Sequence, residues 1–180
     1  THGHYDHCGL LPLLNIRGFT GSIYSTPATR DIANIVMMDS ARIQARDKEY
    51  LSKQAAKHGE TFNWQPLFDE TDVINTVNQF ITVSYYKPVW IGENVKLEFF
   101  DAGHILGSAM AVITVKDSTG KELKIAFTGD LGRKGKPIIR DPDIIPQVDY
   151  IVLESTYGNR RHEGTDNAFY ILAEKTKELV

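Results

Sequence analysis

The chain has 180 residues, with 20 Lys and Arg against 23 Asp and Glu, and a formal net charge of −3. Its apolar fraction of 42% and charged fraction of 24% are ordinary for a packed domain and argue against disordered, collagen-like and low-complexity classes. No apolar run reaches the roughly 18 residues of a membrane span, and the near-neutral charge argues against a broad basic platform for nucleic acid.

The first half of the chain is predicted to be mainly helical. Residues 9–15 have the pattern of a short helix and residues 22–25 that of a short strand. Thr26 then supplies an N-cap and Pro27 a first-turn proline, which predicts a helix whose apolar side carries Ile32, Ile35, Val36 and Ala41. Residues 42–58 lack a wide apolar face, so we expect a surface excursion or lid with an exposed His58. Acidic residues at the start of 69–80 favour a further helix there.

The second half is predicted to be mainly strands. Residues 81–85 and 95–99 alternate between apolar and polar side chains, as strands with one buried face do. Residues 109–115 and 123–127 form a predicted hairpin around a turn at 117–120. The apolar run 150–153 is typical of a buried strand, and helical spacing returns at 167–180. Helices mixed with strands that pair partly as hairpins predict an α/β layered domain with mixed sheets.

Chemistry-bearing residues are concentrated at the N-terminus, where three of the six histidines lie within seven residues. On an extended backbone, residues two apart project the same way, so His2, His4 and Asp6 could converge. Imidazole and carboxylate groups suit zinc and related divalent metals. His7 beside Asp6 suggests a second metal, since ions in known dinuclear sites lie roughly 3.5 to 4 Å apart. The alternative is a histidine-rich tag remnant or a solvated turn, which the interleaved residues and the following apolar helix disfavour.

Three further candidates follow predicted strands, where metal ligands and catalytic groups commonly lie. His104 lies between two glycines that allow close backbone approach, Asp130 follows a strand in a Gly-Asp pair, and Glu154 ends the run 150–153. Each has a structural alternative: a hydrogen-bonded histidine, a turn aspartate and a solvated glutamate. Cys8 is expected to be a small packing residue, and a lone cysteine favours a reducing intracellular compartment such as the cytoplasm.

The stretch His2-Gly-His-Tyr-Asp-His7 resembles the HxHxDH signature of the metallo-β-lactamase superfamily, with His104 and Asp130 in the places of its third histidine and bridging aspartate. Asp39-Ser40 and the stretches 101–109 and 153–158 resemble the β-CASP branch of RNA-processing nucleases. The resemblance implies a partial αββα sandwich, with the N-terminal strands and the C-terminal return outside this chain. It assigns residues 1–164 to that domain and 165–180 to the start of an inserted β-CASP domain or a connecting helix.

The resemblance also implies a site. It places one metal on His2, His4 and His104 and a second on Asp6 and His7, with Asp130 shared, and it implies two zinc ions or another divalent metal. Catalytic roles would fall to Asp6, Asp130 and Glu154, with Glu154 orienting a downstream histidine. Substrate phosphates would contact basic side chains, and the candidates are Arg133, Lys134, Lys136, Arg160 and Arg161. His162, beside the two arginines, is a further weak candidate.

The implied function is metal-dependent hydrolysis of RNA phosphodiester bonds, as an endonuclease or an exonuclease. RNA or another single-stranded nucleic acid would be the partner, with a homo-oligomer or processing complex possible and no membrane. The alternatives are a hydrolase of thioesters, lactones or lactams, which residues 154–158 argue against, and a non-catalytic scaffold subunit, which the full ligand set argues against. Since the resemblance implies another histidine ligand beyond Val180, we expect residues 1–180 alone to bind metal weakly and to show negligible catalysis.

Overall fold

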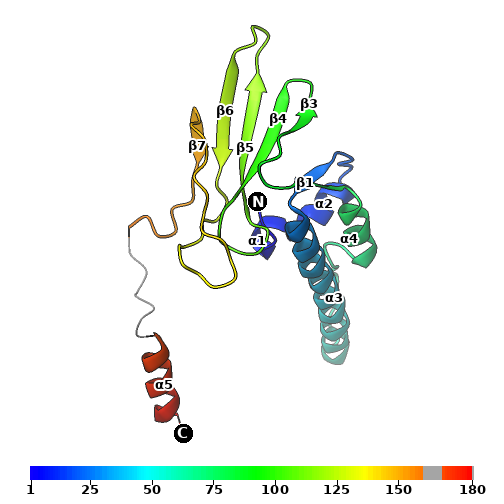
Figure 1. The fold of residues 1–180 in the computed structure, drawn as a ribbon. Coiled ribbons are helices and arrows are strands. Elements are labelled where there is room, and N and C mark those ends of the chain that lie inside the picture. The colour runs from blue at the N-terminus through cyan, green and yellow to red at the C-terminus, as the bar shows by residue number, and fades with distance from the viewer. Residues whose placement is uncertain (160–167, 180) are drawn as a thin grey trace.

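The computed structural model describes residues 1–159 and 168–179, in which helices are combined with two sheets (Figure 1). The strands are β1 (Ile23–Ser25), β2 (Phe80–Thr82), β3 (Val89–Gly92), β4 (Val95–Asp101), β5 (Ala109–Lys116), β6 (Glu122–Phe127) and β7 (Tyr150–Val152). The helices are α1 (Tyr5–Cys8), α2 (Leu11–Ile16), α3 (Pro27–His58), α4 (Glu70–Val77) and α5 (Ala168–Glu178). The predicted α/β class with mixed sheets is confirmed.

The larger sheet has the strand order β3-β4-β5-β6-β7. Its pairs are antiparallel except the last, because β7 runs parallel to β6. The smaller sheet pairs β1 with β2 in parallel. Since β4 and β6 both run opposite to β5, the carboxyl ends of β4, β6 and β7 lie at one edge of the larger sheet. The loops that follow these three strands are thereby brought together.

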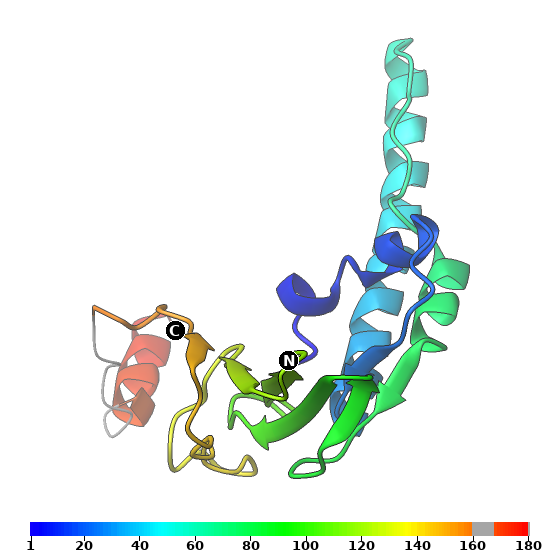
Figure 2. The same cartoon turned by 90° about the horizontal axis from the view of Figure 1, so that it is seen from above.

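Helix α3 begins as its sequence predicts, and its predicted apolar side is buried in part. The Thr26 side chain accepts the Thr29 backbone N–H, and Gly59 ends the helix in the left-handed conformation. The predicted apolar side is wrong at Ile35, which is 67% exposed; the buried residues are Thr29, Ala33, Met37 and Ala41. Small side chains on that face let neighbouring elements approach closely. Residues 42–58, expected as an excursion, continue this helix, whose far end projects away from the sheet (Figure 2) and carries an exposed His58.

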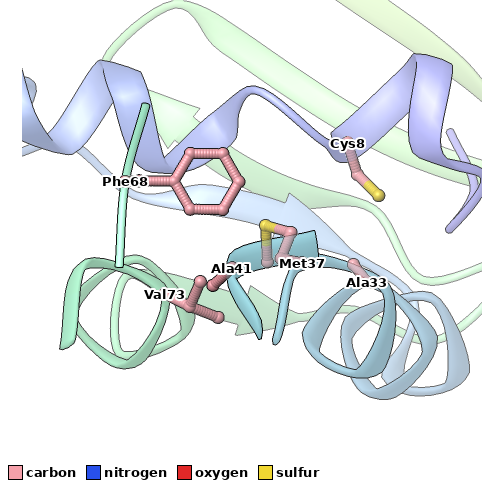
Figure 3. Close-up of a cluster of buried hydrophobic side chains, with 6 residues drawn as sticks. All are labelled: Cys8, Ala33, Met37, Ala41, Phe68 and Val73. Carbon is pink, nitrogen blue, oxygen red and sulfur yellow. The ribbon is translucent and has the colours of Figure 1, made fainter. Parts of the chain in front are cut away.

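One apolar core lies between the helices rather than under the sheet (Figure 3). Helix α3 contributes Ala33, Met37 and Ala41 to it, and the segment leading into α4 contributes Phe68. The cluster is completed by Val73 of α4 and Cys8 of α1. Cys8 is 4% exposed, so its predicted role as a packing residue is confirmed. This core attaches the short helix α1 to the long helix α3.

A second apolar cluster covers one face of the larger sheet and contains Val83, Leu97, Phe99 and Ala109. The run 150–153 does not belong to it, although the sequence predicts a buried strand. Tyr150 is 61% exposed and Val152 is 56% exposed. Among the described residues, β7 is the last strand of the sheet, and neither apolar cluster includes its side chains. Among the described helices, none combines the length and the apolar character that crossing a membrane requires.

Candidate metal centre

The N-terminal segment lies against the edge of the larger sheet where β4, β6 and β7 end (Figure 1). The backbone N–H of Ala109, at the start of β5, donates to the carbonyl of Thr1 at 2.8 Å. A side chain built at Gly129, directly after β6, would collide with the Thr1 side chain at 2.6 Å. The histidines that follow Thr1 are thus fixed beside the loops that carry His104 and Asp130.

Four side chains from three segments converge there: His2, His4, His104 and Asp130. The His2 Nε2 atom lies 3.0 Å from His4 Nδ1, which lies 3.2 Å from His104 Nε2. The Asp130 Oδ2 atom is 3.6 Å from the Nε2 atoms of both His2 and His104. One ligand atom from each residue lies within 4.8 Å of all the others.

The other carboxylate oxygen of Asp130 faces a second pair. Its Oδ1 atom lies 3.3 Å from His7 Nε2, which in turn lies 3.5 Å from an oxygen of Asp6. The expected alternation is wrong here, because residues 5–8 form the helix α1 instead of extended chain. His2 and His4 therefore belong to the first group, whereas His7 lies against the other oxygen of Asp130 and Asp6 lies against His7.

These donor positions fit a divalent cation. Donor atoms about 2.0 to 2.1 Å from a tetrahedral zinc ion are separated by about 3.4 Å, and the separations above scatter around that value. Three imidazole nitrogens and one carboxylate oxygen also form a donor set that zinc prefers. Asp130 directs one oxygen to each group, as an aspartate shared between two cations must. The residues present therefore fit a metal centre, although the distances do not identify the metal.

Burial keeps the central imidazole in the form that binds metal. His2 is 2% exposed, and its ring centroid lies 4.1 to 4.9 Å from those of three other histidines. Desolvation, together with the neighbouring imidazoles, lowers the pKa of His2 to about 3. Burial also lowers the pKa of His104, partly opposed by the charge of Asp130. Because metal ions and protons compete for the same lone pair, a neutral His2 is prepared for coordination near neutral pH.

Three curated relatives share most of this chain. It is 34% identical over 161 residues to the transcription termination factor FttA of Methanosarcina mazei, covering 88% of this chain and 22% of that protein. It is 30% identical over 179 residues to ribonuclease TTHA0252 of Thermus thermophilus, covering 98% of this chain and 36% of that protein. An RNase J-like protein of Methanocaldococcus jannaschii is 31% identical over 160 residues, covering 88% and 31%.

These relatives are members of the β-CASP metallo-β-lactamase family, and this chain is similar to them over most of its length. It spans between 22% and 36% of the length of these three β-CASP relatives. No family model matches the chain.

Two threonines at the start of α3 anchor the His104 loop. The hydroxyls of Thr26 and Thr29 donate to the carbonyl of Gly107, at 2.6 and 2.8 Å. Inside the loop, the fully buried Ser108 hydroxyl accepts the backbone N–H of His104 at 3.0 Å. His104 is therefore oriented by the helix as well as by its own strand. The sequence identified Thr26 only as a helix cap, and nothing in the spacing indicated its second role.

The Asp130 loop lies directly on the His104 loop. The Gly132 backbone N–H donates to the carbonyl of Ala102 at 2.8 Å, and no room for a side chain remains at Gly132. Glu154, which follows β7, accepts the Leu131 backbone N–H at 2.6 Å, which lowers the pKa of its carboxyl group. The carboxylate of Glu154 thus holds the residue next to Asp130, and the sequence had not indicated Gly132 at all.

A polar cavity of about 370 Å³ opens beside these loops. Its lining includes His104 and Asp130 of the ligand group together with Glu154, and Arg133 and Lys136 supply positive charge. The charge of Lys136 contributes to the lowered pKa of His104, which places this cation close to the centre. Of the remaining basic candidates, Lys134 does not line the cavity. Arg160, Arg161 and His162 lie outside the described residues.

Cys8 carries a prediction about reactivity. Its thiol donates to the His4 carbonyl at 3.1 Å, and burial raises its pKa from the ordinary 9.0 to about 11. In the intact protein at pH 8, we expect alkylation by iodoacetamide to be roughly 100-fold slower than in urea, because two pKa units reduce the thiolate fraction by that factor.

The raised pKa of Cys8 also makes the stability of the protein depend on pH. The folded state holds the Cys8 proton more tightly, so the stability contributed by the thiol is present below pH 9 and is lost as pH rises toward 11. Mass spectrometry of the alkylated peptide measures the rate. Equal rates in native buffer and in urea would contradict the burial of the thiol.

Proposed function

We propose that this chain contributes the metal centre of a hydrolase that cleaves phosphodiester bonds of RNA. The observation that carries the proposal is the division of the Asp130 carboxylate between two groups. One oxygen faces His2 and His104, and the other faces His7 and, beyond it, Asp6. Hydrolases that act on phosphate esters with two metal ions need an arrangement of this kind.

The residues assigned to the first cation are His2, His4, His104 and Asp130, and those assigned to the second are Asp6, His7 and Asp130. Bound there, two divalent cations such as zinc would lower the pKa of a water molecule and neutralise charge on the scissile phosphate. His2 would contribute a neutral imidazole, since its lowered pKa leaves it unprotonated near pH 7. Asp130 would fix the spacing of the two groups because both of its oxygens are committed.

Glu154 would act as a positioning residue. It holds the Leu131 N–H and lies at the edge of the cavity that carries Arg133 and Lys136. These two cations would attract the phosphate backbone of the substrate, because contacts to phosphates supply much of the affinity of proteins for nucleic acids. A mild overall negative charge suits this scheme, in which a few local cations and the metals attract the substrate.

The names of the relatives support RNA as the substrate. One is called a ribonuclease, another an RNase J-like protein and a third a transcription termination factor. We also propose that residues 1–164 form part of the metallo-β-lactamase-like sandwich and that 165–180 begin an inserted domain or a connecting helix. A reducing compartment such as the cytoplasm fits a chain whose one cysteine is a buried free thiol.

A substrate panel tests the function. The intact protein is incubated with single-stranded RNA, single-stranded DNA, a thioester and a β-lactam, before and after removal of metal with a chelator. We expect RNA cleavage that is lost on chelation and restored by zinc. The reason is that the bound cations would both activate the attacking water and neutralise charge on the phosphate. Hydrolysis of only the thioester or the lactam would replace the nuclease proposal. A protein that binds zinc and cleaves none of these substrates would support the scaffold alternative.

A further inference from the structure

Tyr5 lies between two of the proposed ligands, His4 and Asp6, yet it has no part in the metal centre. Its side chain is 48% exposed. The hydroxyl accepts a hydrogen bond from the Ser40 hydroxyl of α3 at 3.1 Å. A Cβ built at Gly9 would lie 2.5 Å from two ring carbons, so the ring packs on the backbone of that glycine. The ring is thus held at its hydroxyl and along Gly9, while much of its surface stays open.

A cavity of about 460 Å³ lies beside this ring. Its lining residues are Tyr5, Val36, Asp39, Ser40, Ile43 and Gln44. Gln44 is fixed as part of the wall, because its amide donates to the Ser40 hydroxyl and its carbonyl oxygen accepts the Leu67 N–H. Ile43, on the same helix, is 44% exposed and offers an apolar surface. The cavity is therefore a pre-formed, mainly apolar site whose wall includes the residue between His4 and Asp6.

The two cavities differ in the charged side chains that line them. The cavity next to Asp130 contains Arg133 and Lys136, whereas the cavity beside Tyr5 is lined by no Lys or Arg and includes Asp39. Cations that can contact a phosphate are therefore present in the first cavity and absent from the lining of the second. An uncharged, flat and largely apolar group fits the second cavity.

We propose that the Tyr5 cavity binds the nucleobase of a nucleotide next to the cleaved phosphodiester, stacked on the Tyr5 ring. The inference rests on the proposed nuclease function and adds a base-binding subsite to it. Single-stranded nucleic acids are commonly bound by a cationic path for the phosphates together with aromatic rings for the bases. Because Tyr5 is already fixed by Ser40 and Gly9, stacking costs it little conformational entropy.

The test uses the intact, zinc-loaded protein and a set of otherwise identical RNAs that each lack one base near the cleavage site. Wild type should cleave the complete RNA with a higher kcat/KM than one abasic RNA. Tyr5→Leu should lower kcat/KM on the complete RNA by roughly 5- to 150-fold and remove that preference, since stacking contributes to binding by this factor per base. Tyr5→Phe keeps the ring, so it should retain most of the preference for the complete RNA. Tyr50→Leu, at a 62% exposed tyrosine further along α3, is the matched control and should change neither rate.

Ile43→Glu gives a second test that leaves α1 and the proposed ligands untouched. Its charge would enter the same cavity from α3, so it should weaken the same preference with the zinc content unchanged. A base preference that survives both Tyr5→Leu and Ile43→Glu overturns the inference, and so does an equal loss of rate on complete and abasic RNAs. RNA cleavage without any base preference overturns the subsite alone. No cleavage of any RNA by zinc-loaded wild type overturns the nuclease function itself.

Discussion

Asp130→Asn should lower RNA cleavage by the intact protein by at least about 100-fold and reduce the zinc bound per chain. Asparagine keeps the shape of the side chain but replaces one oxygen with an amide NH₂, which cannot coordinate a cation. In the structure, one oxygen lies 3.6 Å from His2 and His104 and the other lies 3.3 Å from His7. Whichever way the amide turns, one of the two groups loses its shared donor. Loss of an outer partner of a ligand already costs about 10- to 100-fold, and loss of a ligand costs more.

Elemental analysis after dialysis against a defined zinc concentration measures the metal, and a labelled RNA measures the rate. Asp47→Asn is the control, because it makes the same change at an exposed position of α3 away from the site. Circular dichroism should show the same helix content in both variants. Wild-type zinc content and wild-type cleavage in Asp130→Asn would contradict the assignment of Asp130 as the shared ligand.

Gly132→Ala should lower the free energy of unfolding by about 3 kcal/mol or more and weaken zinc binding as well. A Cβ at Gly132 would lie 1.5 Å from the carbonyl oxygen of Gly103 and 2.7 Å from the backbone nitrogen of His104. These are backbone atoms that cannot rotate away, so the two loops must separate. Overpacking costs about 1 to 3 kcal/mol even where side chains can adjust. The separation also moves His104 away from Asp130, which links the loss of stability to a loss of metal affinity.

Gly135→Ala is the matched control in the same loop. Gly135 has φ of +74°, and a Cβ there would meet nothing within 4 Å, so this change tests only backbone strain. It should cost about 1 kcal/mol and leave zinc binding unchanged. Urea unfolding of the metal-free proteins gives both free energies, and a zinc titration gives both affinities. Equal effects of the two substitutions would show that contact between the loops does not set the geometry of the centre.

The sequence alone determined the local elements and the chemistry of the donor set. Thr26 and Pro27 define the start of α3 through backbone rules that act within a few residues. The alternation at 95–99 and the turn at 117–120 define β4 and the hairpin of β5 and β6. His2, His4, His104 and Asp130 could be selected because they are ligand types in a dense N-terminal pattern or directly after strands. Such signals are short in range, so they can be read without knowing the fold.

Only the tertiary structure decided which side chains face one another. The sequence favoured Ile35 for the buried face of α3, but Ala33 and Met37 are buried there, because the positions of α1 and α4 decide which side of the helix is covered. It also suggested that Asp6 could converge with His2 and His4, whereas the helix α1 places Asp6 against His7 and His7 against the far oxygen of Asp130. The contacts that build the centre join residues far apart in the chain. They depend on strand order and on the approach of two loops, which no local pattern of residues records.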